Sequence, residues 1–552
     1  MPPDGLAGER SAAAPDAAAG AVPGRPAASP ATGEGRRGAG PRGRAAASDG
    51  RGAEAAGGTG RTRWGRLGLG LGAGSLVCFL LVALLGPSVM QPALGGGGVP
   101  FSLDAGASPY LVIGLTAAGI VLGTAGLAAC FAAVRRGWRC PAGGLAAAGA
   151  LAAAAFAMMP PVGSADHLNY AAYGRMVVTG HDPYATRAVD MPGDPIADAV
   201  QEWRGAPSVY GPIATAQQAF ASWVGGESVA LTVFALSVTN ALAFVLTGLV
   251  LHRACRTPEG RMRAALLWTC NPLLLFQLVS GAHNDALAIC AAVGMLAVAA
   301  GASRPVLRAA AAGACLGAAG AIKFPAALAG GGPALRMLLR RRLAPLAALT
   351  GAAAAVAGVA YALAGGHAFD QVRRAANSVS LATPWHLVDV ALGVGQHRVV
   401  IRIGSLALLA ALVWLLVRAL PRDPRRDPET AEALVLSAAL VLAWLWSATY
   451  ALPWYDGLGW AVLALLPWSR LDWAALGHTA ALSLAYLPAR DPVLIGLPEE
   501  LMWLVTVLRS DVIPWLLIGL PVWVAVTALR SPRPRPAPAP ARSPRGSAAP
   551  PG

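Results

Sequence analysis

The run D-H-L-N-Y-A-A-Y-G-R, which begins at Asp166, carries the first side chains that could do chemistry. It follows an apolar segment directly, so a helix over 166–178 would hold Asp166, Tyr170, Tyr173 and Arg175 at a membrane surface. Apolar surroundings raise the pKa of a carboxyl group, and a raised pKa suits a general base near neutral pH. Alternatively, Asp166 caps the N-terminus of that helix and the tyrosines form part of an interfacial aromatic belt.

Further polar groups lie in segments that turn the chain. The run T-G-H-D-P-Y ends in Tyr184, and S-V-Y-G-P places Tyr210 in a turn that leads into a helix. The short connection S-G-A-H-N-D then brings His283, Asn284 and Asp285 together between two apolar segments. These three side chains could contact a polar ligand at the membrane face. Alternatively, Asn284 or Asp285 is simply the N-cap of the next helix.

Lys323 is the one lysine among 43 basic residues, and it lies inside an apolar stretch. An ionisable side chain at membrane depth is costly and by default indicates a functional site. A compact ammonium charge is a good partner for a phosphate, such as that of a lipid. The alternative is a lysine at a helix end whose side chain reaches toward water.

Aromatic side chains next to prolines form a softer signal. Trp385 lies in the run T-P-W-H, and Trp454 and Tyr455 lie in Y-A-L-P-W-Y-D. Aromatic planes stack well on the apolar faces of sugar rings. They are also the residues that gather at membrane–water interfaces.

The composition indicates what holds these residues in place. Hydrophobic residues make up 55% of the 552 residues and charged residues only 13%, about half the usual share for a soluble domain. This composition excludes a soluble enzyme, a disulfide scaffold and a coiled coil. It predicts an all-α, multi-pass membrane protein.

Fourteen apolar runs are accepted as spans, because a bilayer core needs about 20 apolar residues per helix. One long span over 306–341 would give thirteen, but Pro325 favours a new helix start after Lys323. The predicted spans are 67–86, 109–134, 144–162, 228–252, 264–281, 285–301, 306–322, 325–341, 343–365, 399–420, 430–451, 456–469, 472–488 and 511–529.

The arginines set the predicted orientation. With the break at Lys323 and both termini in the cytoplasm, most arginines fall on the inner side, as the positive-inside rule requires. The long connections 163–227, 366–398 and 490–511 then face outward and carry the polar chemistry. The expected organisation is a disordered basic tail over 1–66, a membrane domain over 67–530 and a disordered tail over 531–552.

Other sites are not indicated. The net charge of +15 is concentrated partly in the tails, without aromatic interleaving or a nucleic-acid motif, so these tails fit anionic lipid better than nucleic acid. The seven cysteines show no zinc or disulfide spacing. We expect no cofactor and no metal ligand set, and the sequence leaves a divalent-metal requirement open.

Taken in order over roughly residues 67–530, these motifs resemble the lipid-phosphosugar glycosyltransferases of the GT-C fold. The similarity is to their actinobacterial branch, the polyprenol-phosphate-mannose-dependent α-1,6-mannosyltransferases. Asp166 is followed by His167, so the paired acids of some relatives are absent, which argues against a metal held by such a pair. The matching motifs are D-x-x-x-Y-x-x-x-G-R from Asp166, G-x-D-P-Y from Gly180, Tyr210-Gly211-Pro212, G-A-H-N-D from Gly281, Lys323-Phe324-Pro325-Ala326 and Pro453-Trp454-Tyr455.

The resemblance implies a GT-C bundle of about 13–14 helices in the plasma membrane, with its active site in the outer loops. It implies inverting transfer of mannose from polyprenyl-phosphate mannose to an α-1,6-mannan of lipomannan or lipoglycan type, in cell-envelope synthesis. Asp166 would be the base, while Lys323 and then Arg175 would bind the donor phosphate. The remaining candidates would bind sugar or substrate: Tyr170, Tyr173, Tyr184, Tyr210, His283, Asn284, Asp285, Trp385, Trp454 and Tyr455.

Two other classes remain open at this stage. A transporter or a flippase of a lipid-linked sugar would also have many spans and an intramembrane lysine. It would be expected to show internal repeats and ionisable residues near the midplane, whereas these polar residues gather at one face. A non-catalytic partner in envelope assembly would not need Asp166, His283, Asp285 and Lys323 on the same side.

Overall fold

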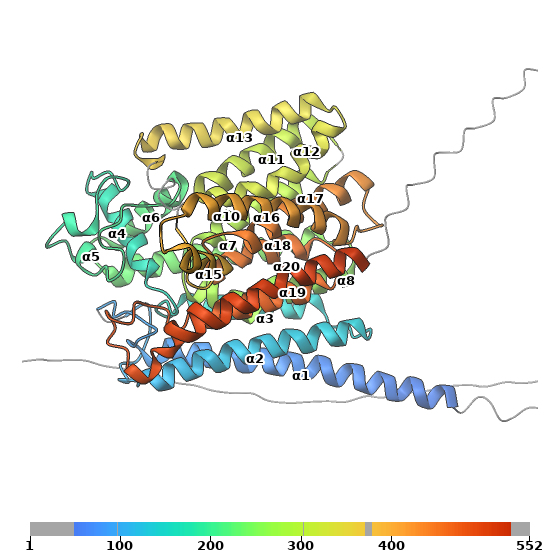
Figure 1. Cartoon of the computed structure of the whole chain (residues 1–552), viewed down its shortest axis with the longest axis horizontal. Helices are drawn as coiled ribbons and strands as arrows, with labels where there is room; N and C mark the ends of the chain where they lie inside the picture. Colours follow the sequence, from blue (N-terminus) through green and yellow to red (C-terminus); the bar gives the residue numbers. More distant parts are fainter. Residues whose placement is uncertain (1–48, 96–97, 302, 370–377, 531–552) are drawn as a thin grey trace, which may run out of the picture. The chain divides into compact units, whose positions relative to one another are not determined.

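The computed structural model describes residues 49–95, 98–301, 303–369 and 378–530 (Figure 1). Throughout these ranges the named secondary structure is helical, and one isolated bridge joins Ser88 and Gln91. The first helix, α1, begins at Asp49, upstream of the expected domain boundary at residue 66. Residues 1–48 and 531–552, which make up most of the two expected tails, lie outside the described residues.

Each of the fourteen expected apolar runs coincides with a helical segment. Within the described ranges, nine helices are long and apolar enough to cross a membrane, and Ala142–Ala157 (α3) and Asp285–Ala299 (α10) are shorter apolar helices. The protein is therefore an all-helical, multi-pass membrane protein. The nine are Thr62–Leu85 in α1, Pro109–Arg135 (α2), Val229–Ala254 (α7), Pro258–Ser280 (α8 to η3), Pro305–Ile322 (α11), Leu343–Ala364 (α13), Arg398–Ala419 (α16), Pro428–Ser447 (α17) and Glu499–Arg530, which contains α20 (Ile513–Arg530).

Some of the expected spans are short helices. They are α12 (Gly331–Leu339), α18 (Asp456–Ala464) and α19 (Leu471–Ala485). The bundle thus combines helices that are long enough to cross a bilayer with segments that are well below the roughly 20 residues that a full crossing needs.

The expected break at Lys323 is confirmed. Helix α11 ends at Ile322, Lys323 has extended backbone angles, and a 3-10 segment, η4 (Phe324–Gly330), begins immediately afterwards. The chain folds back on itself there, since a Cβ added at Gly330 would meet the side chain of Leu316 at 2.6 Å. Lys323 consequently lies at the end of a helix rather than in its interior.

Two glycines bring α11 and α13 into close contact. A Cβ at Gly313 would lie 2.1 Å from the carbonyl oxygen of Leu349, and one at Gly317 would lie 2.5 Å from that of Ala353. Small residues four apart let membrane helices approach closely without a hydrophobic driving force. This packing fixes the helix that ends next to Lys323.

The connection between α3 and α7, which the sequence predicts on the outer side, contains α4 (Asp166–Val178), α5 (Pro195–Asp198) and α6 (Pro212–Gly225), which lie together in Figure 1. Helix α4 packs on α6 so closely that a Cβ at Gly174 would lie 2.1 Å from the carbonyl oxygen of Gln218. At the start of α6, the amide of Gly211 donates to the carbonyl oxygen of Ile322 at 3.0 Å. The Tyr-Gly-Pro turn is thereby bound to the end of α11, directly beside Lys323.

Candidate active site

Asp166 is the first residue of α4, as the sequence predicts, but it does not cap the helix. Ala165 occupies the N-cap position, and no side chain there makes a capping hydrogen bond. The backbone amide of Asp166 is bound instead by the hydroxyl of Ser164 at 3.1 Å. The Asp166 carboxylate is therefore available for contacts outside its own helix.

Those contacts lead to the turn before α10. Oδ2 of Asp166 lies 3.8 Å from Nδ1 of His283. The same nitrogen lies 3.3 Å from the hydroxyl of Tyr170, one turn further along α4. Tyr210, in the turn before α6, donates its hydroxyl to that of Tyr170 at 3.2 Å. Four residues from three distant parts of the sequence thus form one polar chain.

Burial changes the acidity of the carboxyl group of Asp166. Loss of water contact, reinforced by the negative charge of Glu202, raises its pKa from 3.8 to about 7, although the positive charge of Lys323 acts in the opposite direction. A carboxyl group with such a pKa exchanges a proton readily near neutral pH, as a general base must.

The turn that carries His283 is tightly built. Ala282 has a φ of 52°, and its carbonyl oxygen accepts a hydrogen bond from Asn240 of α7 at 2.6 Å. The imidazole of His283 stacks on Trp454, with 3.6 Å between ring centroids and 15° between planes. Burial and the nearby charge of Lys323 hold the pKa of His283 well below 6.5, so the ring is neutral at physiological pH.

Asn284 is the N-cap residue of α10, yet its side chain makes no capping bond. Both polar atoms of its amide are buried and find no hydrogen-bond partner among the described residues. A buried polar group without a partner is costly. Asn284 is thus a group that a bound polar ligand could satisfy.

Lys323 is bound by Asp285, the first residue of α10. Its Nζ lies 2.7 Å from each carboxylate oxygen and 3.9 Å from the centre of the Tyr455 ring. The ammonium has three N–H donors, so a donor remains for another anion. The lysine side chain is 18% exposed, which leaves it reachable at the end of α11.

Aromatic rings connect the group around Asp166 and His283 with the Asp285–Lys323 ion pair. Trp454 meets Tyr455 and Tyr486 edge to face, with ring centroids 6.2 Å and 5.0 Å away. Because Trp454 stacks on His283 and Tyr455 faces Lys323, the imidazole and the ammonium border one continuous aromatic surface. We call the following residues the polar cluster: Asp166, Tyr170, Tyr210, His283, Asp285, Lys323, Trp454 and Tyr455.

Four predicted site residues have their polar groups engaged elsewhere. The guanidinium of Arg175 binds Asp194 at 2.7 Å and approaches Glu227 at 3.6 Å. Three aromatic side chains form hydrogen bonds with groups outside the polar cluster: Tyr173 with the carbonyl oxygen of Ala206, Tyr184 with Thr215 and Trp385 with the carbonyl oxygen of Ser447. The Tyr173 ring still lies 6.5 Å from that of Tyr210.

The sequence analysis missed Glu202 and Tyr486. Glu202 lies between α5 and α6 and influences the charge on Asp166, while its own pKa is raised by burial. The one available signal was its position among the acids of the long connection 163–227. Tyr486 ends α19, and no local pattern distinguished it from other interfacial tyrosines.

The sequence was compared with models of known protein families. Residues 70–341 match the family described as "Alpha-(1->6)-mannopyranosyltransferase, N-terminal domain". This part of the chain belongs to that family. The matched range contains Asp166, His283, Asp285 and Lys323 of the polar cluster, whereas Trp454 and Tyr455 lie beyond it.

Individual members of the family align over shorter stretches. Alpha-(1->6)-mannopyranosyltransferase A of Corynebacterium glutamicum is 29% identical over 139 residues, which cover 25% of this chain and 28% of that protein. Alpha-(1->6)-mannopyranosyltransferase B of the same organism is 31% identical over 133 residues, 23% of this chain and 22% of the relative. The enzyme A of Mycobacterium tuberculosis is 31% identical over 136 residues, 23% and 25% of the two chains. The aligned segments thus span about a quarter of these relatives, and no solved structure matches the chain.

Proposed function

We propose that this protein is an inverting mannosyltransferase that moves mannose from polyprenyl-phosphate mannose to an α-1,6-mannan acceptor of lipomannan or lipoglycan type. We place its active site on the outer face of the plasma membrane, with both chain ends in the cytoplasm. The family description supports the reaction class. The observation that carries the proposal is the Asp166 carboxyl group, which is only 17% exposed, has a pKa raised to about 7 and lies 3.8 Å from His283 in the cluster that also contains Lys323.

In the proposed reaction, Asp166 accepts the proton of an acceptor hydroxyl. The hydroxyl oxygen forms a bond to the anomeric carbon of the donor mannose, on the side opposite the phosphate. The bond between that carbon and the phosphate oxygen breaks, and its electron pair leaves with the polyprenyl phosphate. Attack from the opposite side inverts the configuration, so a β-linked donor gives an α-linked product.

Lys323 stabilises the charge of the departing phosphate, since electrostatic stabilisation of developing charge is often the largest catalytic contribution. Asp285 holds the ammonium in place by its two contacts of 2.7 Å. This role for Asp285 replaces direct binding of the sugar, because both of its oxygens face Lys323. Arg175 has no part in the proposed step, since Asp194 holds its guanidinium.

The remaining cluster residues position the two sugars. His283, neutral because its pKa is low, bridges Asp166 and Tyr170 and keeps the carboxylate oriented. Trp454 and Tyr455 provide ring faces for stacking against a mannose unit. The buried amide of Asn284 is suited to bind sugar hydroxyls.

The test is transfer of labelled mannose from polyprenyl-phosphate mannose to a short α-1,6-mannoside in membranes that contain the Asp166→Asn variant. We expect the rate to fall by about 10²–10⁴-fold, the usual contribution of a positioned base, with unchanged protein in the membrane fraction. Asp190→Asn is the matched control, because Asp190 is exposed in the same outer segment and pairs with Arg187. Full activity of the Asp166→Asn variant would refute the proposal.

A further inference from the structure

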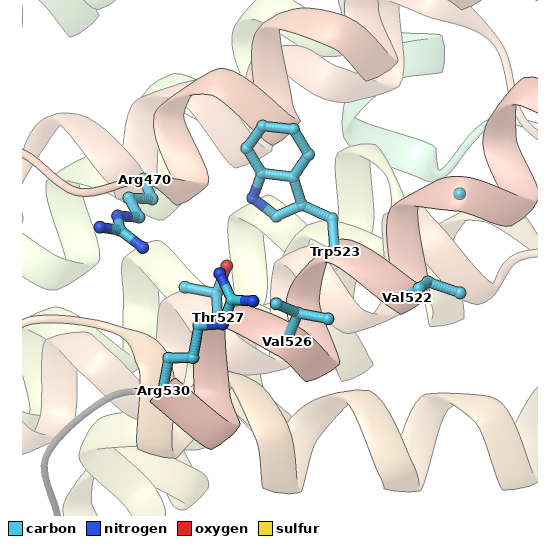
Figure 2. Close-up of a pocket in the computed structure, with 7 residues that line it drawn as sticks. Arg470, Val522, Trp523, Val526, Thr527 and Arg530 are labelled. Atoms are coloured by element: carbon cyan, nitrogen blue, oxygen red, sulfur yellow. The ribbon is translucent and has the colours of Figure 1, made fainter.

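A groove of about 400 Å³, shown in Figure 2, lies between α20 and the connection that precedes α19. Arg470, in the connection between α18 and α19, and Arg530, the last residue of α20, contribute to its lining. Helix α19 begins next to Arg470 and ends at Ala485, beside Tyr486, which contacts Trp454. Its 15 residues separate the two ends by about 22 Å, so the groove is distinct from the candidate active site.

The two arginines of the groove have charges that the described residues leave unpaired. Neither guanidinium has a hydrogen bond or ion pair to any residue in the described ranges. The nearest acid along the sequence is Asp472, and its carboxylate is fully engaged by Arg263, at 2.6 Å and 2.9 Å, and by the amide of Ser469. No Asp or Glu lines the groove, so an anion would meet two positive charges without competition.

The rest of the groove is apolar and open to the outside. Val522 is 60% exposed, Trp523 49% and Val526 40%. All three belong to the membrane-crossing segment Glu499–Arg530, so these side chains face lipid rather than a protein neighbour. In Figure 2, Trp523 lies on the same helix as Val522 and Val526, and Arg470 lies on a neighbouring segment. A tryptophan at such a boundary is typical of the membrane–water interface.

We propose that this groove binds an anionic phospholipid of the leaflet opposite the candidate active site. The guanidiniums of Arg470 and Arg530 bind the phosphate of the headgroup, a geometry for which arginine is well suited. One acyl chain lies along Val522 and Val526, below the phosphate. A headgroup without an acyl chain would leave the apolar side chains uncovered. A zwitterionic lipid would bring its own cation close to the two guanidiniums. The groove therefore fits an anionic lipid best.

The experiment is native mass spectrometry of the full-length protein in detergent, titrated with dioleoyl phosphatidylglycerol or dioleoyl phosphatidylcholine. We expect the protein to bind phosphatidylglycerol in preference to phosphatidylcholine. Each arginine near an anionic lipid contributes about fivefold in affinity, so the Arg470→Gln/Arg530→Gln double variant should weaken binding by roughly 25-fold. The control for loss of positive charge elsewhere is Arg340→Gln, which removes one charge from an exposed residue at the end of α12 and should leave binding unchanged.

Three results would overturn the inference. The first is equal binding of phosphatidylglycerol by the wild type and the double variant, or an equal loss in the Arg340→Gln control. The second is displacement of the lipid by soluble glycerol 3-phosphate alone, because the acyl chain would then contribute nothing. The third is a dimer mass that disappears in the double variant, which would make a second copy of the chain the occupant. Each readout is independent of mannose transfer, so failure here leaves the proposed reaction untouched.

Discussion

The acidity of Asp166 predicts how mannose transfer depends on pH. Its carboxyl group has a pKa of about 7 instead of 3.8, because burial and the charge of Glu202 disfavour the ionised form. A general base must be ionised to accept a proton, so the rate should rise as the pH increases through 7. With this pKa, about 9% of the carboxyl groups are ionised at pH 6 and about 91% at pH 8, which gives roughly a tenfold rise.

The assay measures kcat/KM for labelled polyprenyl-phosphate mannose between pH 5.5 and 9 at constant ionic strength, since this ratio reports the ionisation of the free enzyme. The donor is a phosphodiester and stays ionised over that range, so it does not contribute to the change. A carboxyl group of ordinary acidity would instead give a flat profile above pH 5.5.

Two neighbours provide controls of opposite sign. Glu202→Gln removes a negative charge that raises the pKa of Asp166, so the rising limb should move to lower pH. Lys323→Met removes a positive charge that lowers this pKa. The activity of this variant should be reduced, and the rise of its kcat/KM with pH should occur at higher pH. Asp190→Asn, at an exposed ion pair, should leave the limb in place. A flat profile, or shifts of Glu202→Gln and Lys323→Met in the same direction, would refute the assignment of Asp166 as the base.

Three further predictions follow from the contacts. Lys323→Met should lower donor turnover by about 10²-fold or more, the usual effect of losing one transition-state donor. The Lys323→Met/Asp285→Asn double variant, in which Asp285 is no longer an unpaired acid, should not recover this turnover. Recovered turnover would assign the lysine a purely structural role. Gly211→Ala should reduce transfer sharply, because its Cβ would lie 2.1 Å from a carbonyl oxygen of α11, and a fully active variant would contradict the docking of this turn beside the site. Asp472→Asn should lower the free energy of unfolding by about 3–5 kcal/mol in thermal unfolding in detergent, because Arg263 would lose its buried partner. Replacing both residues with leucine should recover most of that loss. Unchanged unfolding of the single variant would show that the ion pair is not needed for stability.

Much of the fold could be read from local patterns. Apolar runs fixed where each helix lies, since burial in lipid demands a long apolar helix. The start of α4 at Asp166 and the break at Lys323 followed from the adjacent apolar segment and from Pro325. Span length was less predictable. Helix α18 has only nine residues, and its apolar character alone did not show that it would end so early.

The candidate site was predictable as a set of residues but not as a set of contacts. The sequence placed Asp166, His283 and Lys323 at the same end of the bundle, because helix direction alternates along the chain. The family resemblance also implied Arg175 as a second phosphate ligand. The fold instead directs its guanidinium to Asp194, since a charged side chain that is partly buried pairs with the acid that packing brings to it.

The sequence by itself determined that this is a helical membrane protein, which residue types gather at one end of its helices, and which family its motifs resemble. These properties depend on hydrophobic run lengths and on short motifs, which are local. Only the tertiary structure decided that Glu202 influences Asp166, that Asp285 binds Lys323 and that Trp454 stacks on His283. Those relations join residues 36 to 171 positions apart in the sequence, and both the pKa of a buried acid and the pairing of a buried charge are set by whatever neighbours long-range packing supplies.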